Sequence, residues 1–152
     1  MKIYVDADAF PNVLKDILFR AARRVGVSVV LVANKRLWVP QEELFSSVMV
    51  PGGPDEADDK IVELIEPGDL VITADIPLAD RVVTKNAYAV NPRGELYTET
   101  NIKHRLAMRD LMHELREEGA ISGGPPSFNK KDVQTFTNQL DRFLTKHVKQ
   151  QS

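Results

Sequence analysis

The stretch that decides the fold runs Leu70-Val71-Ile72-Thr73-Ala74-Asp75-Ile76-Pro77-Leu78-Ala79. Its first four residues are apolar or β-branched and are typical of a buried strand. Residues 76–86 then carry apolar side chains at helical spacing, with an inward side formed by Leu78, Ala79, Val82 and Val83. A buried strand that runs directly into an amphipathic helix indicates a parallel sheet covered by helices.

The same alternation extends to both sides of this stretch. Strands are predicted at residues 2–5, 28–33, 47–50, 87–90 and 95–98, and helices at 13–25, after Asp55, from Asn101 onward and over 133–148. Neither a repeat nor a domain linker interrupts the 152 residues. We therefore expect a single domain over residues 1–152 of the α/β class, with three α/β/α layers, a mainly parallel sheet and C-terminal helices.

Composition narrows the class of protein. The chain is 43% apolar and 28% charged, as soluble globular domains are, and its lack of cysteine excludes disulfides and thiolate chemistry. No apolar run approaches the about 20 residues that cross a bilayer, and the first residues predict a strand and not a signal peptide, so we expect a cytoplasmic protein without membrane contact.

Charge is distributed unevenly along the chain. Residues 51–80 hold nine acidic residues and one basic residue, a net charge of −8, against −2 for the whole chain. The remainder is mildly basic and is able to face phosphates.

Seven aspartates follow predicted strands or open predicted helices: Asp6, Asp8, Asp55, Asp58, Asp59, Asp75 and Asp80. In open α/β sheets, ligands collect beyond the carboxyl ends of the strands. Carboxylate oxygens are the ligands that hard divalent cations prefer. We therefore predict a site for Mg²⁺ or Mn²⁺ held by Asp6, Asp8, Asp55, Asp58, Asp59 and Asp75, with Asp6, Asp8, Asp59 and Asp75 as the catalytic set.

Five of these aspartates also have a purely structural interpretation. Asp55 and Asp75 both precede predicted helices and fit as N-caps, and Asp58 and Asp59 complement a helix dipole. Asp80 fits a solvated helix position. Asp6 and Asp8 are two apart, so an extended segment would point both side chains the same way.

Basic and aromatic residues supply a substrate-binding hypothesis. Lys35 and Arg36 follow a strand end, Arg105 and Arg109 lie on one helical stripe with His113 and Arg116, and Thr73 precedes Asp75. We assign Lys35, Arg36, Thr73, Arg105 and Arg109 to substrate binding, and a solvated face to His113 and Arg116. Trp38 is assigned to packing, with stacking on a base as the alternative.

Several of these segments resemble a bacterial family. The motifs are Val5-Asp6-Ala7-Asp8-Ala9, the segment 55–62, the segment 68–79, Asn91-Pro92-Arg93-Gly94, Asn101-Ile102, Arg109-Asp110-Leu111-Met112 and Gly123-Gly124-Pro125. In their order and length they resemble the YaiI/YqxD family of uncharacterised proteins, which is grouped with PIN-like domains. PIN-like proteins bind Mg²⁺ or Mn²⁺ through acidic residues at strand ends and cut RNA or DNA, so the resemblance implies a PIN-like nuclease.

One position departs from the pattern expected of the family. Phe10 stands before Pro11, where a cysteine is expected. If that cysteine were catalytic, this chain would be inactive. The retained aspartates make metal chemistry the more economical interpretation.

Three functions remain open at this point. The first is a metal-dependent phosphodiesterase that cuts RNA or, as a second choice, single-stranded DNA. The second is a non-catalytic domain that binds nucleic acid or protein through basic residues. The third is a phosphatase of the haloacid-dehalogenase type, suggested by Asp6, Asp8, Asp75 and Asp80, but its expected Ser or Thr is absent after Val32.

Overall fold

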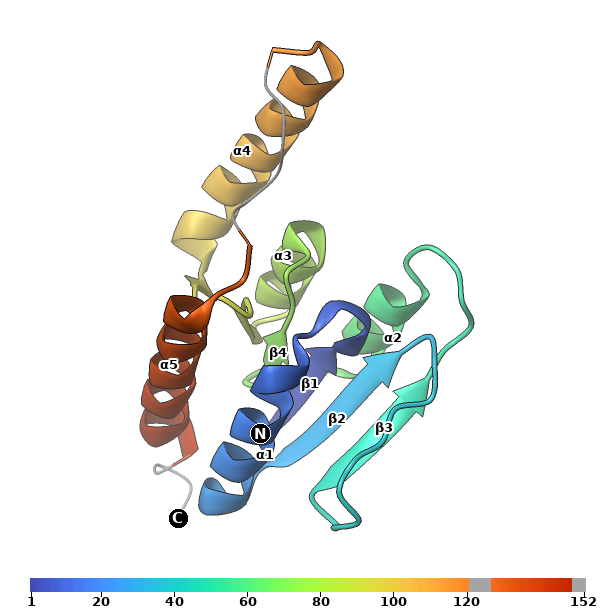
Figure 1. The fold of residues 1–152 in the computed structure, drawn as a ribbon, viewed down its shortest axis with the longest axis vertical. Helices are drawn as coiled ribbons and strands as arrows, with labels where there is room; N and C mark the ends of the chain where they lie inside the picture. Colours follow the sequence, from blue (N-terminus) through green and yellow to red (C-terminus); the bar gives the residue numbers. More distant parts are fainter. Residues whose placement is uncertain (121–126, 149–152) are drawn as a thin grey trace.

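The computed structural model describes residues 1–120 and 127–148, and the motif Gly123-Gly124-Pro125 lies outside them. Within these residues the chain forms strands and helices in alternation (Figure 1). The strands are β1 (Lys2–Asp6), β2 (Ser28–Ala33), β3 (Phe45–Met49), β4 (Leu70–Ile72), β5 (Tyr88–Val90) and β6 (Leu96–Tyr97). The helices are the 3-10 turn η1 (Ala7–Ala9), α1 (Asn12–Val25), α2 (Glu56–Leu64), α3 (Ile76–Thr84), α4 (Glu99–Glu117) and α5 (Lys130–Val148).

The strands form one sheet in the order β3-β2-β1-β4-β5-β6. All neighbours pair in parallel except β5 and β6, which are antiparallel. The order reverses at β1, whose two neighbours are β2 and β4. This is the switch point at which open α/β sheets bind ligands beyond the carboxyl ends of their strands.

Helices cover both faces of the sheet, because successive residues of each strand point to opposite sides. In β1, Ile3 and Val5 pack with residues of α1 and α5, whereas Tyr4 packs with residues of α2, α3 and α4. The two buried clusters are separate. The predicted three-layer α/β/α architecture with a mainly parallel sheet is therefore confirmed.

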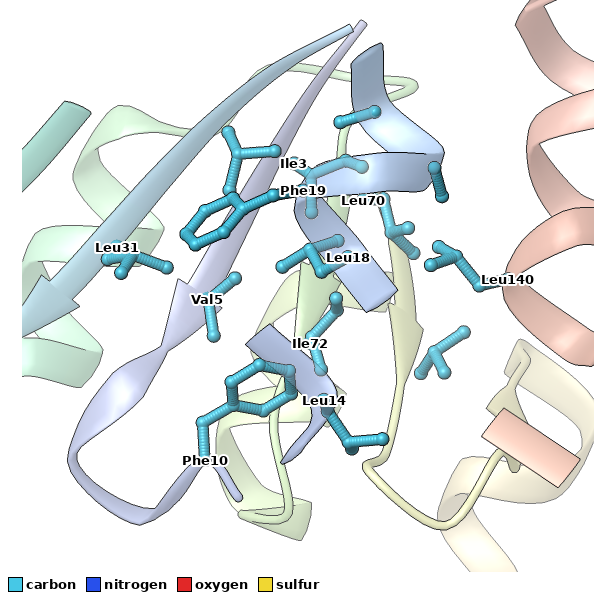
Figure 2. Packing of buried hydrophobic residues seen from close by; sticks show 14 of the residues in the cluster. Ile3, Val5, Phe10, Leu14, Leu18, Phe19, Leu31, Leu70, Ile72 and Leu140 are labelled. Atoms are coloured by element: carbon cyan, nitrogen blue, oxygen red, sulfur yellow. The ribbon is translucent and has the colours of Figure 1, made fainter. Parts of the chain in front are cut away.

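Phe10 belongs to the core on the α1 side. Its side chain is 6% exposed, and its ring lies 6.1 Å from the ring of Phe136 of α5 in an edge-on arrangement. Figure 2 shows Phe10 close to Leu14 and Ile72 in the cluster beneath α1. The residue that departs from the expected family pattern thus packs the core.

Two local predictions were wrong at element boundaries. The helix predicted from Asn101 onward, α4, begins two residues earlier, with Thr98 as N-cap and Asn101 completing a reciprocal capping box. Strand β3 begins at Phe45 and not at Ser47. Its solvated Ser46 and Ser47 hide the start of the strand from an apolar pattern.

Helix α4 projects beyond the rest of the molecule (Figure 1). Its only fully buried residue is Ile102, while Met108, Leu111 and Met112 are 39%, 46% and 36% exposed. The apolar side of α4 therefore does not enter the core beyond the first turns. No helix in the described part of the chain is long and apolar enough to cross a membrane.

Candidate acidic site at the carboxyl ends of the strands

Asp6 is held at the end of β1 by the neighbouring strand. The β1–β4 register pairs Val5 with Ile72, which brings Thr73 beside Asp6. The buried Thr73 hydroxyl donates a hydrogen bond to Asp6 Oδ2 at 2.9 Å. Burial raises the pKa of Asp6, this hydrogen bond lowers it, and the charges of Asp75 and Asp8 raise it, with a net upward shift.

Asp75 is tied into the same arrangement through Thr73. The backbone N–H of Asp75 donates to Thr73 Oγ1 at 3.0 Å, so the Thr73 hydroxyl connects the two aspartates. Asp75 Oδ1 accepts from the N–H of Leu78 at 2.8 Å and caps α3. The structural interpretation of Asp75 is thus confirmed, and Oδ1 is oriented by the helix.

Asp8 does not point the same way as Asp6, and that prediction was wrong. Residues 7–9 form a 3-10 turn instead of an extended segment, which rotates Asp8 toward β2. Both oxygens of Asp8 lie 3.0 and 3.2 Å from the backbone nitrogen of Asn34, which donates to them. Asp8 therefore connects the end of β1 to the loop that follows β2.

Asp58 is the residue of α2 that faces the strand-end aspartates. Burial and the negative charges of Asp75, Asp6 and Asp55 raise its pKa to about 6, and Arg81 lowers it. Like charges held close together disfavour the ionised form. Asp58 is therefore electrostatically coupled to both Asp6 and Asp75.

The remaining acids have other surroundings. Asp59 is exposed and pairs with Arg81 of α3 at 2.9 Å, and Asp80 pairs with Lys103 of α4 at 2.8 Å. Asp55 occupies the N-cap position of α2 with a φ of 65°, but its side chain makes no capping hydrogen bond there. Asp55 thus takes the predicted N-cap position without forming a side-chain cap.

The side chains of Asp6, Asp58 and Asp75 are of a suitable type for a hard divalent cation, since they offer only carboxylate oxygens. They are not, however, close enough together to form a coordination shell. Among residues 1–120 and 127–148, no group of three or more Asp, Glu or His side chains is close enough to hold a metal ion. Binding would require these carboxylates to approach one another by changes of rotamer.

The structure separates the predicted basic residues into two groups. Arg105 pairs with Glu95, and Arg109 pairs with the adjacent Asp110. Lys35 and Arg36 are exposed in the loop directly after Asn34, and in the described part of the chain neither forms an ion pair with an acidic side chain.

A cavity of about 450 Å³ lies beside the aspartates, and we did not predict it from sequence. Ala9, Ala74 and Ile76, which flank Asp8 and Asp75 in the chain, line one part of it; Asn91, Arg93, Arg105 and Phe128 line another. The strand-end rule that found the aspartates applies equally to Asn91 and Arg93, because they follow β5. Phe128 comes from a distant segment that carries no comparable signal.

Trp38 contradicts the packing interpretation. Its side chain is 73% exposed, although Leu37 and Val39 on either side pack against the core. The prediction that Trp38 packs in the core was therefore wrong.

Comparison with known proteins shows which family the chain belongs to. A family model described as "Uncharacterized BCR, YaiI/YqxD family" matches residues 4–146. The chain belongs to the YaiI/YqxD family.

Relatives named UPF0178 proteins, from several bacteria, match almost end to end. A UPF0178 protein of Photobacterium profundum is 57% identical over 149 residues, which are 98% of this chain and 99% of the relative. Another, from Sulfurimonas denitrificans, is 53% identical over 148 residues, 97% of this chain and 98% of the relative. No solved structure matches the chain. The names of these relatives state no activity, so functional inference rests on the site.

Proposed function

We propose that this protein is a divalent-metal-dependent phosphodiesterase that acts on RNA. The observation that carries the proposal is the placement of Asp6 and Asp75 around the Thr73 hydroxyl at the carboxyl ends of β1 and β4, with Asp58 of α2 electrostatically coupled to both. Carboxylates that repel one another at a ligand-binding edge are stabilised by a cation. The resemblance to PIN-like nucleases points to the same chemistry.

Residues of the chain would prepare this site. Thr73 orients Asp6 through its hydroxyl, and the N-terminus of α3 orients Asp75. Asp6, Asp58 and Asp75 would hold the cation, with Asp8 beside them and Asp55 and Asp59 on the same edge. When bound, Mg²⁺ or Mn²⁺ would supply polarisation of the phosphate and activation of water.

Basic residues at the same edge would hold the nucleic-acid backbone. Lys35 and Arg36 follow the Asp8 contact at Asn34, and Arg105 lines the adjoining cavity. Arg109, one turn further along α4, would extend this surface. Below about pH 6 Asp58 carries a proton, which cation binding would release.

A cleavage assay tests this function. Single-stranded oligoribonucleotides are incubated with the protein in Mn²⁺, in Mg²⁺ and in chelator. We expect cleavage only with metal, and a cleavage rate lower by about a hundredfold or more in Asp6→Asn and Asp75→Asn. Removing a residue that supports a metal ligand already lowers activity by up to about a hundredfold, and removing the ligand itself should lower it at least as much. Asparagine caps helices as well as aspartate does, so Asp75→Asn keeps α3 intact.

Asp141→Asn is the matched control, since Asp141 makes only a surface pair with Arg24 and should leave cleavage unchanged. Equal cleavage by all three variants would identify a contaminating nuclease and remove support for the proposal. Absence of cleavage by the unmodified protein with either metal would contradict catalysis.

A non-catalytic nucleic-acid-binding domain is the second candidate. The observation that favours it is the lack of a preassembled group of three metal-ligating side chains within the described residues. It predicts binding of RNA that is indifferent to metal and to Asp6→Asn.

A further inference from the structure

Trp38 is an unusually exposed aromatic side chain. It is the only tryptophan of the chain and is 73% exposed, the largest exposed fraction among the large apolar residues of the described part. Partly buried Leu37 and Val39 anchor the segment on either side against the core. An indole held outward on an anchored segment offers a flat apolar face to a ligand.

Two cationic side chains lie within three positions of Trp38 in the sequence. Lys35 and Arg36 are both exposed, and neither pairs with an acid within the described residues, in contrast to Arg105 and Arg109. Unpaired cations beside an exposed aromatic ring are the combination that proteins use to bind single strands, with phosphates on the cations and bases on the ring.

The segment begins at the acidic site. Asn34, the residue before Lys35, donates its backbone N–H to the carboxylate of Asp8 at 3.0 Å. Trp38 lies four positions after Asn34, a span of at most about 14 Å, since an extended residue covers at most about 3.3–3.6 Å. A strand with its phosphates on Lys35 and Arg36 and a base on Trp38 would therefore lie within about 14 Å of the acidic site.

We propose that the loop of residues 35–38, here called the Trp38 loop, is a stacking platform for single-stranded nucleic acid. Lys35 and Arg36 bind backbone phosphates, and Trp38 stacks on an unpaired base. This assignment takes its substrate class from the proposed function, but the binding step requires no metal. It gives the protein a preference for single strands, because the bases of a duplex already stack on one another.

The intrinsic fluorescence of the protein reports this contact directly, because Trp38 is its only tryptophan. The full chain is titrated in chelator with oligouridylate and with oligothymidylate of about 12 nucleotides, within the about 4–16 nucleotides that single-strand sites cover. We expect both oligonucleotides to quench the fluorescence in a saturable way. The one that binds more tightly identifies RNA or DNA as the preferred ligand. A duplex of the same length should quench weakly.

Variants separate stacking from charge. Binding to labelled oligonucleotide is followed by anisotropy, and Trp38→Leu should weaken it about 5- to 150-fold, whereas Trp38→Phe should retain most of it. Lys35→Gln/Arg36→Gln should reduce the slope of log binding constant against log salt concentration by about 1.4, because each single-strand phosphate contact contributes about 0.7 to that slope. The control Arg20→Gln/Arg24→Gln removes the same charge from the far end of α1 and should change neither quantity.

Each outcome decides the proposal. The proposal is supported if single strands quench the Trp38 fluorescence and Trp38→Leu binds them more weakly. The proposal is overturned by any of four results: binding without quenching, binding unaffected by Trp38→Leu, equal quenching by the duplex, or no binding. Absence of binding would leave a protein as the partner of the Trp38 loop. Because no metal is present, failure of the acidic site leaves this result unchanged, and the two proposals fail separately.

Discussion

At the scale of single residues, Asp75 has a structural role that the proposed metal binding would have to share. The sequence left open whether it caps a helix or binds metal, and the structure shows the cap. That cap uses Oδ1, and the backbone of Asp75 also holds the Thr73 hydroxyl that binds Asp6. Thr73 is buried, and its position beside Asp6 follows from the β1–β4 register.

Asp58 gives a prediction about pH and stability. Its pKa of about 6 in the folded protein lies above its ordinary value of 3.8, so the folded state binds more protons than the unfolded state between these limits. Stability should fall as the pH rises from about 4 to about 6, and the loss should persist above. Asp58→Asn removes the repulsion and should therefore stabilise the metal-free protein at about pH 8 but hardly at about pH 4.

Because Asp58 remains partly exposed, solvent limits the gain at the higher pH to about 1 kcal/mol, or about 2–4 °C in Tm. Thermal unfolding of both proteins in chelator measures it, with Asp141→Asn as a variant that should not gain. A loss of stability at about pH 8, or an equal gain at both pH values, would contradict the coupling of Asp58 to Asp6 and Asp75.

The sequence identified the acidic residues but not their orientation on α2. Successive helical residues differ in direction by about 100°, so Asp58 and Asp59 face different neighbours. Only the position of α3 decides that Asp59 meets Arg81 while Asp58 faces the strand ends. The same limit applies to Trp38, whose exposure depends on neighbours that the local pattern does not show.

At the scale of elements, the turn between β5 and β6 is fixed by close contact with α5. Gly94 has a φ of 96°, and a Cβ placed on it would lie 2.6 Å from the carbonyl carbon and 2.7 Å from the carbonyl oxygen of Thr135. Both strain and overlap with backbone oppose a side chain here. The turn carries Asn91 and Arg93 at the edge of the cavity.

Gly94→Ala should therefore cost about 2–4 kcal/mol in the free energy of unfolding. Gly26→Ala is the matched comparison, because Gly26 has a φ of 74° but nothing within 4 Å of its Cβ position. It should cost only about 1 kcal/mol. Urea unfolding of the two variants measures the difference, and equal losses would show that the contact with Thr135 contributes nothing.

At the scale of the whole molecule, the fold followed from the sequence because each strand and its helix form one local unit. Alternating apolar runs and amphipathic segments predicted the parallel sheet and its three layers. They did not predict the strand order, which depends on contacts between distant residues such as Ile3 with Leu70. That order places β1 between β2 and β4, and so brings Asp6, Asp75 and the Asp8–Asn34 contact to one edge.

Calorimetric titration with Mn²⁺ and Mg²⁺ measures metal binding at the strand-end aspartates directly. We expect the unmodified protein and Asp141→Asn to bind in the micromolar-to-millimolar range, more weakly below about pH 6. Asp6→Asn/Asp75→Asn, which keeps its helix cap, should lose this binding. No binding by the unmodified protein, or equal binding by the double variant, would contradict a metal site at these aspartates.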